Sequence, residues 1–381
     1  MKVAIAHHWI MSYRGGERVL EQIASLFEQA PIYALTHDAA IDVPGLVNRD
    51  IQTSFLNRLP RIEKLYKHLL PLHPLAISRM HVPDNVELLL SSDASLIKAI
   101  PTSSRTKHVC YCHSPPRYLW EVIEDYKNNS WSTKLLLDRC LPALKRFDFA
   151  AAQRVDHFIA NSKFVASRIQ NYYGRESDVV YPPVAIEKFD ADQPRDDFYL
   201  VLSELVPYKR IDIAVKAFAG TDRKLVVIGD GSERSKLEAM ATSNISFKGR
   251  QPFAAVKQYF ETAKAFIFPG IEDFGITPVE AQAAGCPVIA FAAGGALETV
   301  IDNETGLFFK FQTAESLRDA IERFERITIE IDACVANARR FCTVRFQTEY
   351  SECLQRYTKG KLAMPSTVVN PKNSQHCLSS S

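Results

Sequence analysis

The sequence predicts an α/β protein with two domains, each built on a parallel β-sheet. A chain of 381 residues exceeds the usual size of a single hydrophobic core. Short apolar runs alternate with helical segments from Val3 onward and again from Phe198 onward, which is typical of strand–helix units. Between the two series stands Pro182-Pro183, which favours a stiff, extended connection.

Composition and charge exclude several classes of protein. A net charge of +2 leaves no domain-wide basic excess, so nucleic acid is not an expected partner. No run approaches the ~20 apolar residues of a membrane span, and residues 1–6 are too short for a signal peptide. The eight cysteines are scattered, and Cys110 and Cys112 lack zinc-site or redox spacing. We therefore expect reduced, structural thiols in a cytoplasmic protein.

The first half contains the turns that we expect at the ligand-binding edge of a sheet. Gly15-Gly16, between a strand and a helix, allows close approach of a ligand to the backbone. His113 leaves a strand into a Pro-Pro turn, which favours exposure at that edge, although a lone histidine is more often structural. The expected strands are 3–6, 86–90, 107–111 and 156–160, and the expected helices are 17–28, 131–154 and 163–173.

The stretch 269–280 organises the second half. It follows the apolar run 265–268 and leads into a helix expected over 278–285. A helix start offers unpaired N–H groups and a partial positive charge, which suit a phosphate. Glu272 and Glu280 flank this start, and carboxylates accept hydrogen bonds from hydroxyls. The stretch therefore predicts a ligand that carries both a diphosphate and sugar hydroxyls, the alternative being an exposed acidic loop.

The other elements of the second half repeat the alternation. Lys209 and Arg210 precede a helix at 211–219, and Gly229 and Gly231 form a small-residue turn after a strand. Further strands are expected at 198–203, 225–228, 245–247, 287–290 and 305–308, and further helices at 313–326, 329–341 and 344–357. Residues 360–381 lack periodicity, which predicts a disordered tail.

Residues 55–81 form a basic, amphipathic segment. Arg58, Arg61, Lys64, Lys67 and Arg79 alternate with apolar residues and outnumber a single glutamate. Such a segment can lie on an anionic membrane surface. The alternative, a domain helix with a solvated basic face, explains the pattern equally well.

The string Glu-Asp-Phe-Gly-Ile-x-Pro-x-Glu-Ala at 272–281, followed by Gly-x-Pro-Val at 285–288, resembles the motif of retaining glycosyltransferases of family 4. The resemblance covers roughly residues 1–358 and implies the GT-B fold, in which two Rossmann-like domains face a cleft. It implies an N-terminal acceptor-side domain over 1–187, joined by a returning helix at 343–359, and a nucleotide-sugar domain over 195–342.

The resemblance also implies the roles of individual residues. Glu272, His113 and Lys209 would be catalytic, because they contact the transferring sugar or the departing diphosphate. The implied acceptor side contains Arg117, Tyr118 and Trp120, for which simple packing is the alternative. The implied donor-binding residues are Gly15, Gly16, Lys209, Arg210, Gly229, Gly231, Arg250, Phe274, Gly275, Ile276, Thr277 and Glu280.

The nearest resemblance, through 205–212 and 112–118, is to mannosyltransferases of O-antigen and exopolysaccharide assembly. GDP-mannose is therefore the expected donor, and a saccharide on a polyprenyl diphosphate is the expected acceptor. A cytoplasmic location follows, with residues 55–81 as a peripheral contact to the inner leaflet. No Asp-x-Asp pair stands in a setting that argues for Mg²⁺, so we expect neither a cofactor nor a metal in the transfer.

One departure from the family pattern concerns charge. Glu204 stands where the family normally has an arginine that binds the diphosphate. A carboxylate there should weaken donor binding unless Arg210 or Arg14 compensates. Two alternatives therefore stay open: a GT-B epimerase of UDP-sugars, and a catalytically impaired nucleotide-sugar-binding subunit of a polysaccharide-assembly complex.

Overall fold

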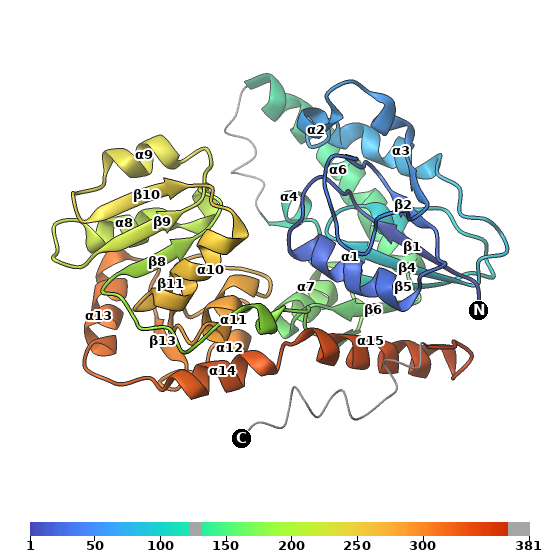
Figure 1. The fold of residues 1–381 in the computed structure, drawn as a ribbon. Helices are drawn as coiled ribbons and strands as arrows, with labels where there is room; N and C mark the ends of the chain where they lie inside the picture. The colour runs from blue at the N-terminus through green and yellow to red at the C-terminus, as the bar shows by residue number, and fades with distance from the viewer. Residues whose placement is uncertain (122–130, 365–381) are drawn as a thin grey trace. The chain divides into compact units, whose positions relative to one another are not determined.

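The computed structural model describes residues 1–121 and 131–364, and the chain divides into two compact units. The first unit contains Met1–Pro183 and the described residues from Phe346 onward, and the second contains Val184–Arg345. The chain passes between these units after Pro183 and again after Arg345. Figure 1 shows an α/β arrangement in each unit.

The first unit is built on a parallel sheet with the strand order β3-β2-β1-β4-β5-β6-β7. Its strands are β1 (Val3–His7), β2 (Ile32–Ala34), β3 (Ile51–Thr53), β4 (Leu88–Asp93), β5 (Lys107–Cys112), β6 (His157–Ala160) and β7 (Ser177–Val179). Its α-helices are α1 (Gly15–Leu26), α2 (Ile62–Leu65), α3 (His73–Ser78), α4 (Arg117–Trp120), α6 (Trp131–Arg154), α7 (Lys163–Tyr173) and α15 (Thr343–Thr358).

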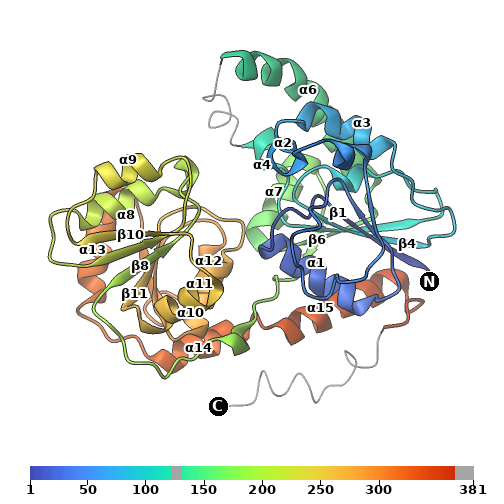
Figure 2. The same ribbon diagram turned by 45° about the horizontal axis from the view of Figure 1, so that its top comes forward.

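Side chains that alternate along these strands pack into apolar cores on the two faces of the sheet. Ile5 and Leu90 pack with α1 and α15 on one face, and Ala4 and Leu89 pack with α3 and α6 on the other. Figures 1 and 2 both show α15 running beside the sheet on the α1 side. The expected return of the C-terminal helix to the first domain is therefore confirmed.

The second unit is built on a parallel sheet with the strand order β10-β9-β8-β11-β12-β13. Its strands are β8 (Tyr199–Leu202), β9 (Leu225–Ile228), β10 (Ile245–Gly249), β11 (Ala265–Phe268), β12 (Val288–Phe291) and β13 (Gly306–Phe309). Its α-helices are α8 (Ile211–Phe218), α9 (Arg234–Ala239), α10 (Phe253–Thr262), α11 (Ile276–Ala283), α12 (Ala296–Thr299), α13 (Ala314–Phe324) and α14 (Ile331–Arg339).

Both faces of the second sheet are also covered. Val201 and Ile267 contribute to a core with α8 and α13, and Leu200 and Phe266 contribute to another with α10 and α11. Strands buried on both faces are apolar throughout, which explains why runs such as 265–268 stand out in the sequence. In each sheet the strand order reverses once, between β1 and β4 and between β8 and β11.

Three sequence-based expectations need correction. Residues 55–81 do not form one helix but four short pieces: Phe55–Arg58, Ile62–Leu65, Leu70–Leu72 and His73–Ser78. Helix α1 begins at Gly15, so the glycine pair lies in its first turn. Within the expected tail, the apolar side chain of Leu362 packs into the core formed by α1 and α15 and is buried there. Residues 365–381 lie outside the described residues.

Candidate functional site

Three histidines gather where the strand order of the first sheet reverses. His7 pairs with Ser92 in the parallel register, and its Nδ1 lies 3.1 Å from Ser92 Oγ. His113, directly after β5, places Nε2 2.7 Å from the same oxygen, and His8 Nδ1 is 3.3 Å from the Ser92 carbonyl oxygen. We call these four residues the histidine cluster. Ligands of open parallel sheets bind at such a reversal.

The histidine cluster is held in its neutral form. Burial lowers the pKa of all three imidazoles, and burial together with the neighbouring His8 brings that of His113 to about 3. Nε2 of His7 is buried and makes no hydrogen bond within the described residues. A neutral imidazole offers one donor and one acceptor. The cluster therefore suits hydroxyl groups better than phosphates.

A buried ion-pair network supports the loop that carries His113. Lys98 Nζ lies 2.5 Å from Asp148 Oδ1 and 3.3 Å from Asp93 Oδ2, and all three side chains are at most 2% exposed. The amide of His113 donates to the Asp93 carbonyl oxygen at 2.8 Å. The network thus fixes the end of β4 beside the histidine cluster.

The glycine pair lies against the same cluster. A Cβ on Gly16 would stand 3.5 Å from Cε1 of His8 and 3.7 Å from Cε1 of His7. The side chain of Glu17 accepts a hydrogen bond from the Arg14 amide at 2.9 Å and so caps α1. The structure therefore brings Gly15, Gly16 and His113 together within the first unit.

Two of the three residues expected on the acceptor side, Trp120 and Tyr118, make contacts within the first unit. The Trp120 indole donates to Asp148 at 2.8 Å and stacks on Tyr172, with ring centroids 5.1 Å apart. The Tyr118 hydroxyl lies 2.6 Å from a serine hydroxyl. The polar atoms of Trp120 and Tyr118 and one indole face are thus engaged within the first unit, and the expected acceptor-side role of both residues stays a prediction. Arg117 is partly exposed at the start of α4.

In the second unit, Lys209 and Glu272 form an ion pair where the second sheet reverses its strand order. Lys209 follows β8 and Glu272 follows β11, and the two side chains are 20% and 19% exposed. Both line a small pocket together with Ser203 and Gly270. Two of the three expected catalytic residues therefore meet at one sheet edge, although 63 positions separate them in the chain.

Neighbouring turns hold the loop that carries Glu272. The Gly295 amide donates to the Glu272 carbonyl oxygen at 2.8 Å, and Gln312 Nε2 donates to the Pro269 carbonyl oxygen at 2.9 Å. Arg210 contacts the same glutamine, 3.2 Å from Nη1 to Oε1. Sequence reasoning missed Gln312, because a lone glutamine after a strand carries no motif.

Helix α11 starts directly beside this loop. Gly275 precedes it with φ +88°, a left-handed conformation that favours glycine. No side chain within the described residues caps the helix start, and Ile276 and Thr277 are partly exposed. The first amides of a helix have no partner inside it. Phe274 packs on Phe341, and Glu280 is 6% exposed on the second turn.

The remaining residues expected to bind the donor are Gly229, Gly231 and Arg250. A Cβ on Gly229 would stand 1.8 Å from the Ser203 carbonyl oxygen, and one on Gly231 would stand 2.3 Å from that of Leu205. These glycines allow the turns after β8 and β9 to pack together, and their expected contact with the nucleotide stays a prediction. Arg250 is exposed after β10.

Sequence reasoning also left His7, His8 and Ser92 without a role. His7 ends an apolar strand, His8 follows it, and both stand shortly before the glycine pair. This position in the sequence could have identified them as candidate site residues. Ser92 was missed because the expected strand stopped at Leu90, whereas β4 continues to Asp93.

Comparison with family models assigns both units to glycosyltransferases. A model described as Glycosyltransferase Family 4 matches residues 13–188, and one described as Glycosyl transferases group 1 matches residues 185–341. Together they span most of the chain and include His113, Lys209 and Glu272, whereas His7 and His8 precede the first match. The chain therefore belongs to glycosyltransferase family 4.

Characterised relatives resemble part of the chain. It is 28% identical over 210 residues to a GDP-mannose-dependent alpha-(1-6)-phosphatidylinositol monomannoside mannosyltransferase of Mycobacterium tuberculosis, covering 46% of this chain and 53% of the relative. It is 25% identical over 202 residues to the O-antigen chain mannosyltransferase RfbU of Salmonella typhimurium, covering 48% and 57%. The chain thus spans about half the length of the curated relatives it matches.

Solved structures support the fold. The Anabaena protein Alr3699/HepE in complex with UDP superposes with a TM-score of 0.66 at 18% identity, covering 93% of this chain and 100% of that one. Such neighbours confirm the expected GT-B fold. Within the described residues, no helix combines the length and apolar character needed to cross a membrane.

Proposed function

We propose that the protein transfers a hexose from a nucleotide sugar to a saccharide acceptor and keeps the anomeric configuration. The observation that carries the proposal is the Lys209–Glu272 pair beside the uncapped start of α11. It places a cation, a carboxylate and free helix amides at one sheet edge, which matches a diphosphate joined to a sugar. The names of relatives support mannose from GDP-mannose as the donor.

The proposed chemistry breaks the bond between the sugar C1 and the diphosphate oxygen. The bonding electrons leave with the diphosphate, so negative charge grows there while positive charge grows on the sugar. Lys209 and the amides of Ile276 and Thr277 stabilise the departing anion. The acceptor hydroxyl then bonds to C1 on the same face and passes its proton to the departing diphosphate oxygen.

The carboxylates and the histidine cluster serve hydroxyl groups in this proposal. Glu272 exchanges its bond to Lys209 for hydrogen bonds from sugar hydroxyls when the donor binds. Glu280 accepts hydrogen bonds from the ribose. Neutral His113 contacts a hydroxyl of the transferring sugar, because an uncharged ring can donate or accept there.

Two matched substitutions test these roles. Lys209→Ala should weaken GDP binding and lower transfer from GDP-mannose by about 10²-fold or more, the scale of one preorganised contact. Glu272→Gln should lower transfer similarly, yet bind GDP at least as tightly as wild type, because it leaves the Lys209 ammonium available. Lys216→Ala removes an ammonium that is 54% exposed on α8 and should change neither. Near wild-type transfer in both site variants would refute the proposal.

The same assay separates this function from its alternatives. Acceptor-dependent formation of a glycosylated product supports transfer. Rearrangement or hydrolysis of a UDP-sugar without an acceptor indicates the epimerase, and donor binding without turnover over an acceptor panel indicates a binding subunit.

A peripheral membrane contact through residues 55–81 is part of the proposal. Leu59, Leu65, Leu72 and Leu75 are 38–44% exposed, unusual for leucine. The five cations of the segment are also exposed, and each contributes about 1 kcal/mol near an anionic surface.

Vesicle binding tests that contact. The full chain should co-sediment with vesicles that contain phosphatidylserine, and less so in high salt. Leu65→Ser with Leu75→Ser should weaken binding, whereas Leu297→Ser, which changes an exposed leucine of the second unit, should not. Absence of binding to anionic vesicles contradicts the contact.

A further inference from the structure

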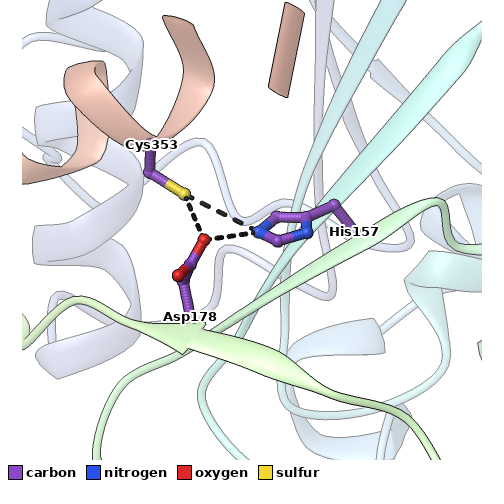
Figure 3. A group of neighbouring side chains, drawn as sticks. All are labelled: His157, Asp178 and Cys353. Carbon is purple, nitrogen blue, oxygen red and sulfur yellow. Dashed lines mark hydrogen bonds and ion pairs between the residues drawn. The ribbon is translucent and has the colours of Figure 1, made fainter. Parts of the chain in front are cut away.

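Three side chains with metal-binding atoms converge at the edge of the first sheet, away from the histidine cluster in the strand order. His157 opens β6, Asp178 lies in the neighbouring edge strand β7, and Cys353 lies on α15. Figure 3 shows their side chains pointing toward one another. The cysteine stands 196 and 175 positions from the other two. No role in sugar transfer uses this group.

The distances within the group fit a single metal ion. His157 Nε2 lies 2.9 Å from Asp178 Oδ2, and Cys353 Sγ lies 3.2 Å from that oxygen and 3.7 Å from that nitrogen. With metal–ligand bonds of about 2.0–2.3 Å, neighbouring ligands of a tetrahedral zinc ion stand roughly 3.3–3.6 Å apart. Small side-chain shifts therefore suffice to place an ion between the three atoms.

The donor set and its charge favour zinc over Mg²⁺ or Ca²⁺. A thiolate, an imidazole and a carboxylate combine soft and intermediate ligands, which zinc accepts and the hard cations avoid. A Cys353 thiolate and the Asp178 carboxylate together carry two negative charges and neutralise a divalent ion. The His157 and Asp178 side chains are 26% and 43% exposed, so solvent reaches the group.

The same geometry argues against a catalytic cysteine. Sγ and the carboxylate both approach Nε2 of His157, whereas a nucleophilic triad places the carboxylate on the opposite ring nitrogen. Burial, with Asp178 adding to it, raises the pKa of the Cys353 thiol to about 12, so the metal-free thiol is not a nucleophile at neutral pH. A metal ion would displace the thiol proton on binding.

We propose that His157, Asp178 and Cys353 bind one zinc-class divalent ion that fastens α15 to the edge of the first sheet. The chain leaves the first unit at Pro183 and re-enters it at Phe346, so the ion joins two segments that the whole second unit separates. Because the three ligands meet only when both segments are folded together, binding of the ion stabilises the folded unit.

Metal titration of the purified full chain tests the proposal. After treatment with a chelator, the protein should bind one equivalent of Zn²⁺, and Co²⁺ should give the near-ultraviolet absorption of a thiolate–cobalt bond. Cys353→Ser and His157→Gln should each weaken Zn²⁺ binding by about 100-fold or more, beyond the loss of an outer partner. Zn²⁺ should raise the unfolding temperature of wild type but not of these variants.

Matched variants make the result specific. Cys140→Ser changes a half-buried thiol of α6, and Cys377→Ser changes one outside the described residues; both should bind Zn²⁺ like wild type. Arg356 Nη2 lies 3.4 Å from Asp178 Oδ2 on a side chain that is 67% exposed, so Arg356→Ala should tighten binding by removing an opposing charge.

Two results would overturn the proposal. One is wild-type protein that shows no thiolate–cobalt absorption, a measurement that does not depend on any variant folding. The other is Cys353→Ser protein that keeps wild-type Zn²⁺ affinity. In either case the three side chains form only a hydrogen-bonded fastening of α15.

Discussion

Replacing Lys98 by methionine tests whether the buried ion-pair network holds the candidate site of the first unit in place. The substitution keeps most of the side-chain volume and removes the ammonium between Asp93 and Asp148. Both carboxylates stay at most 2% exposed. Asp148 keeps hydrogen bonds from Trp120 and Tyr173 at 2.8 and 2.7 Å, but no cation then balances the two charges.

The expected destabilisation is about 3–5 kcal/mol, the usual cost of removing one partner from a buried ion pair. For a unit of this size each kcal/mol lowers the midpoint of unfolding by roughly 2–4 °C, so a fall of about 6–20 °C is expected. The Lys98 ammonium opposes the effect of burial on the pKa of Asp93, so without it burial should raise that folded-state pKa above the unfolded value. The difference in unfolding free energy between wild type and Lys98→Met should therefore become smaller as the pH falls toward 4.

Thermal and guanidinium unfolding at pH 7.5 and pH 5 measure this effect. Lys64→Met removes an exposed lysine of the same unit and should change stability by less than about 0.5 kcal/mol. Asp148→Asn combined with Lys98→Met should cost less than the sum of the single changes, because the two residues share one interaction. A loss below 1 kcal/mol for Lys98→Met at pH 7.5 would refute the reasoning.

Three further predictions concern pH, packing and charge. Burial lowers the pKa of His7, His108 and His113, the latter two to about 3, so the unfolded chain binds more protons below pH 6.5. Stability measured by urea unfolding should fall by up to about 1.4 kcal/mol per pH unit for each histidine between pH 6.5 and 4; a flat profile contradicts this. Gly229→Ala should cost about 1–3 kcal/mol by overpacking, because its Cβ would stand 1.8 Å from a carbonyl oxygen; unchanged thermal stability counts against it. Glu204→Arg should tighten GDP binding in calorimetry, and an unchanged affinity means that the charge is already compensated.

The sequence predicted those parts of the fold where local and tertiary preferences agree. Strands β9 and β11 have the expected bounds, because in each a run of four apolar residues, preceded by a lysine and followed by Gly229 or Pro269, lies within the sheet between its two cores. Helix α7 has its expected bounds, and Ser162 caps it, its hydroxyl accepting from the Val165 amide at 3.0 Å. Lys209 and Glu272 could be placed together because both follow strands at the same edge of a parallel sheet.

The rest could not be predicted because distant contacts decide it. Ser91, Ser92 and Asp93 look like loop residues, yet they continue β4, since His108, His113 and Lys98 satisfy their polar atoms. Strands β2 and β3 have only three residues each, too few for a periodic signal. The convergence of His157, Asp178 and Cys353 depends on the path of α15, which spacing does not reveal.

The split first unit has a consequence for synthesis on the ribosome. Phe346, Tyr350 and Leu354 complete the core around α1, but they are translated only after the entire second unit. At 5–20 residues per second, roughly ten to thirty seconds pass between Pro183 and Phe346. During that interval the nascent chain lacks the side chains of α15 that complete this core, so chaperones that bind exposed apolar residues should associate with it until translation reaches the last helix.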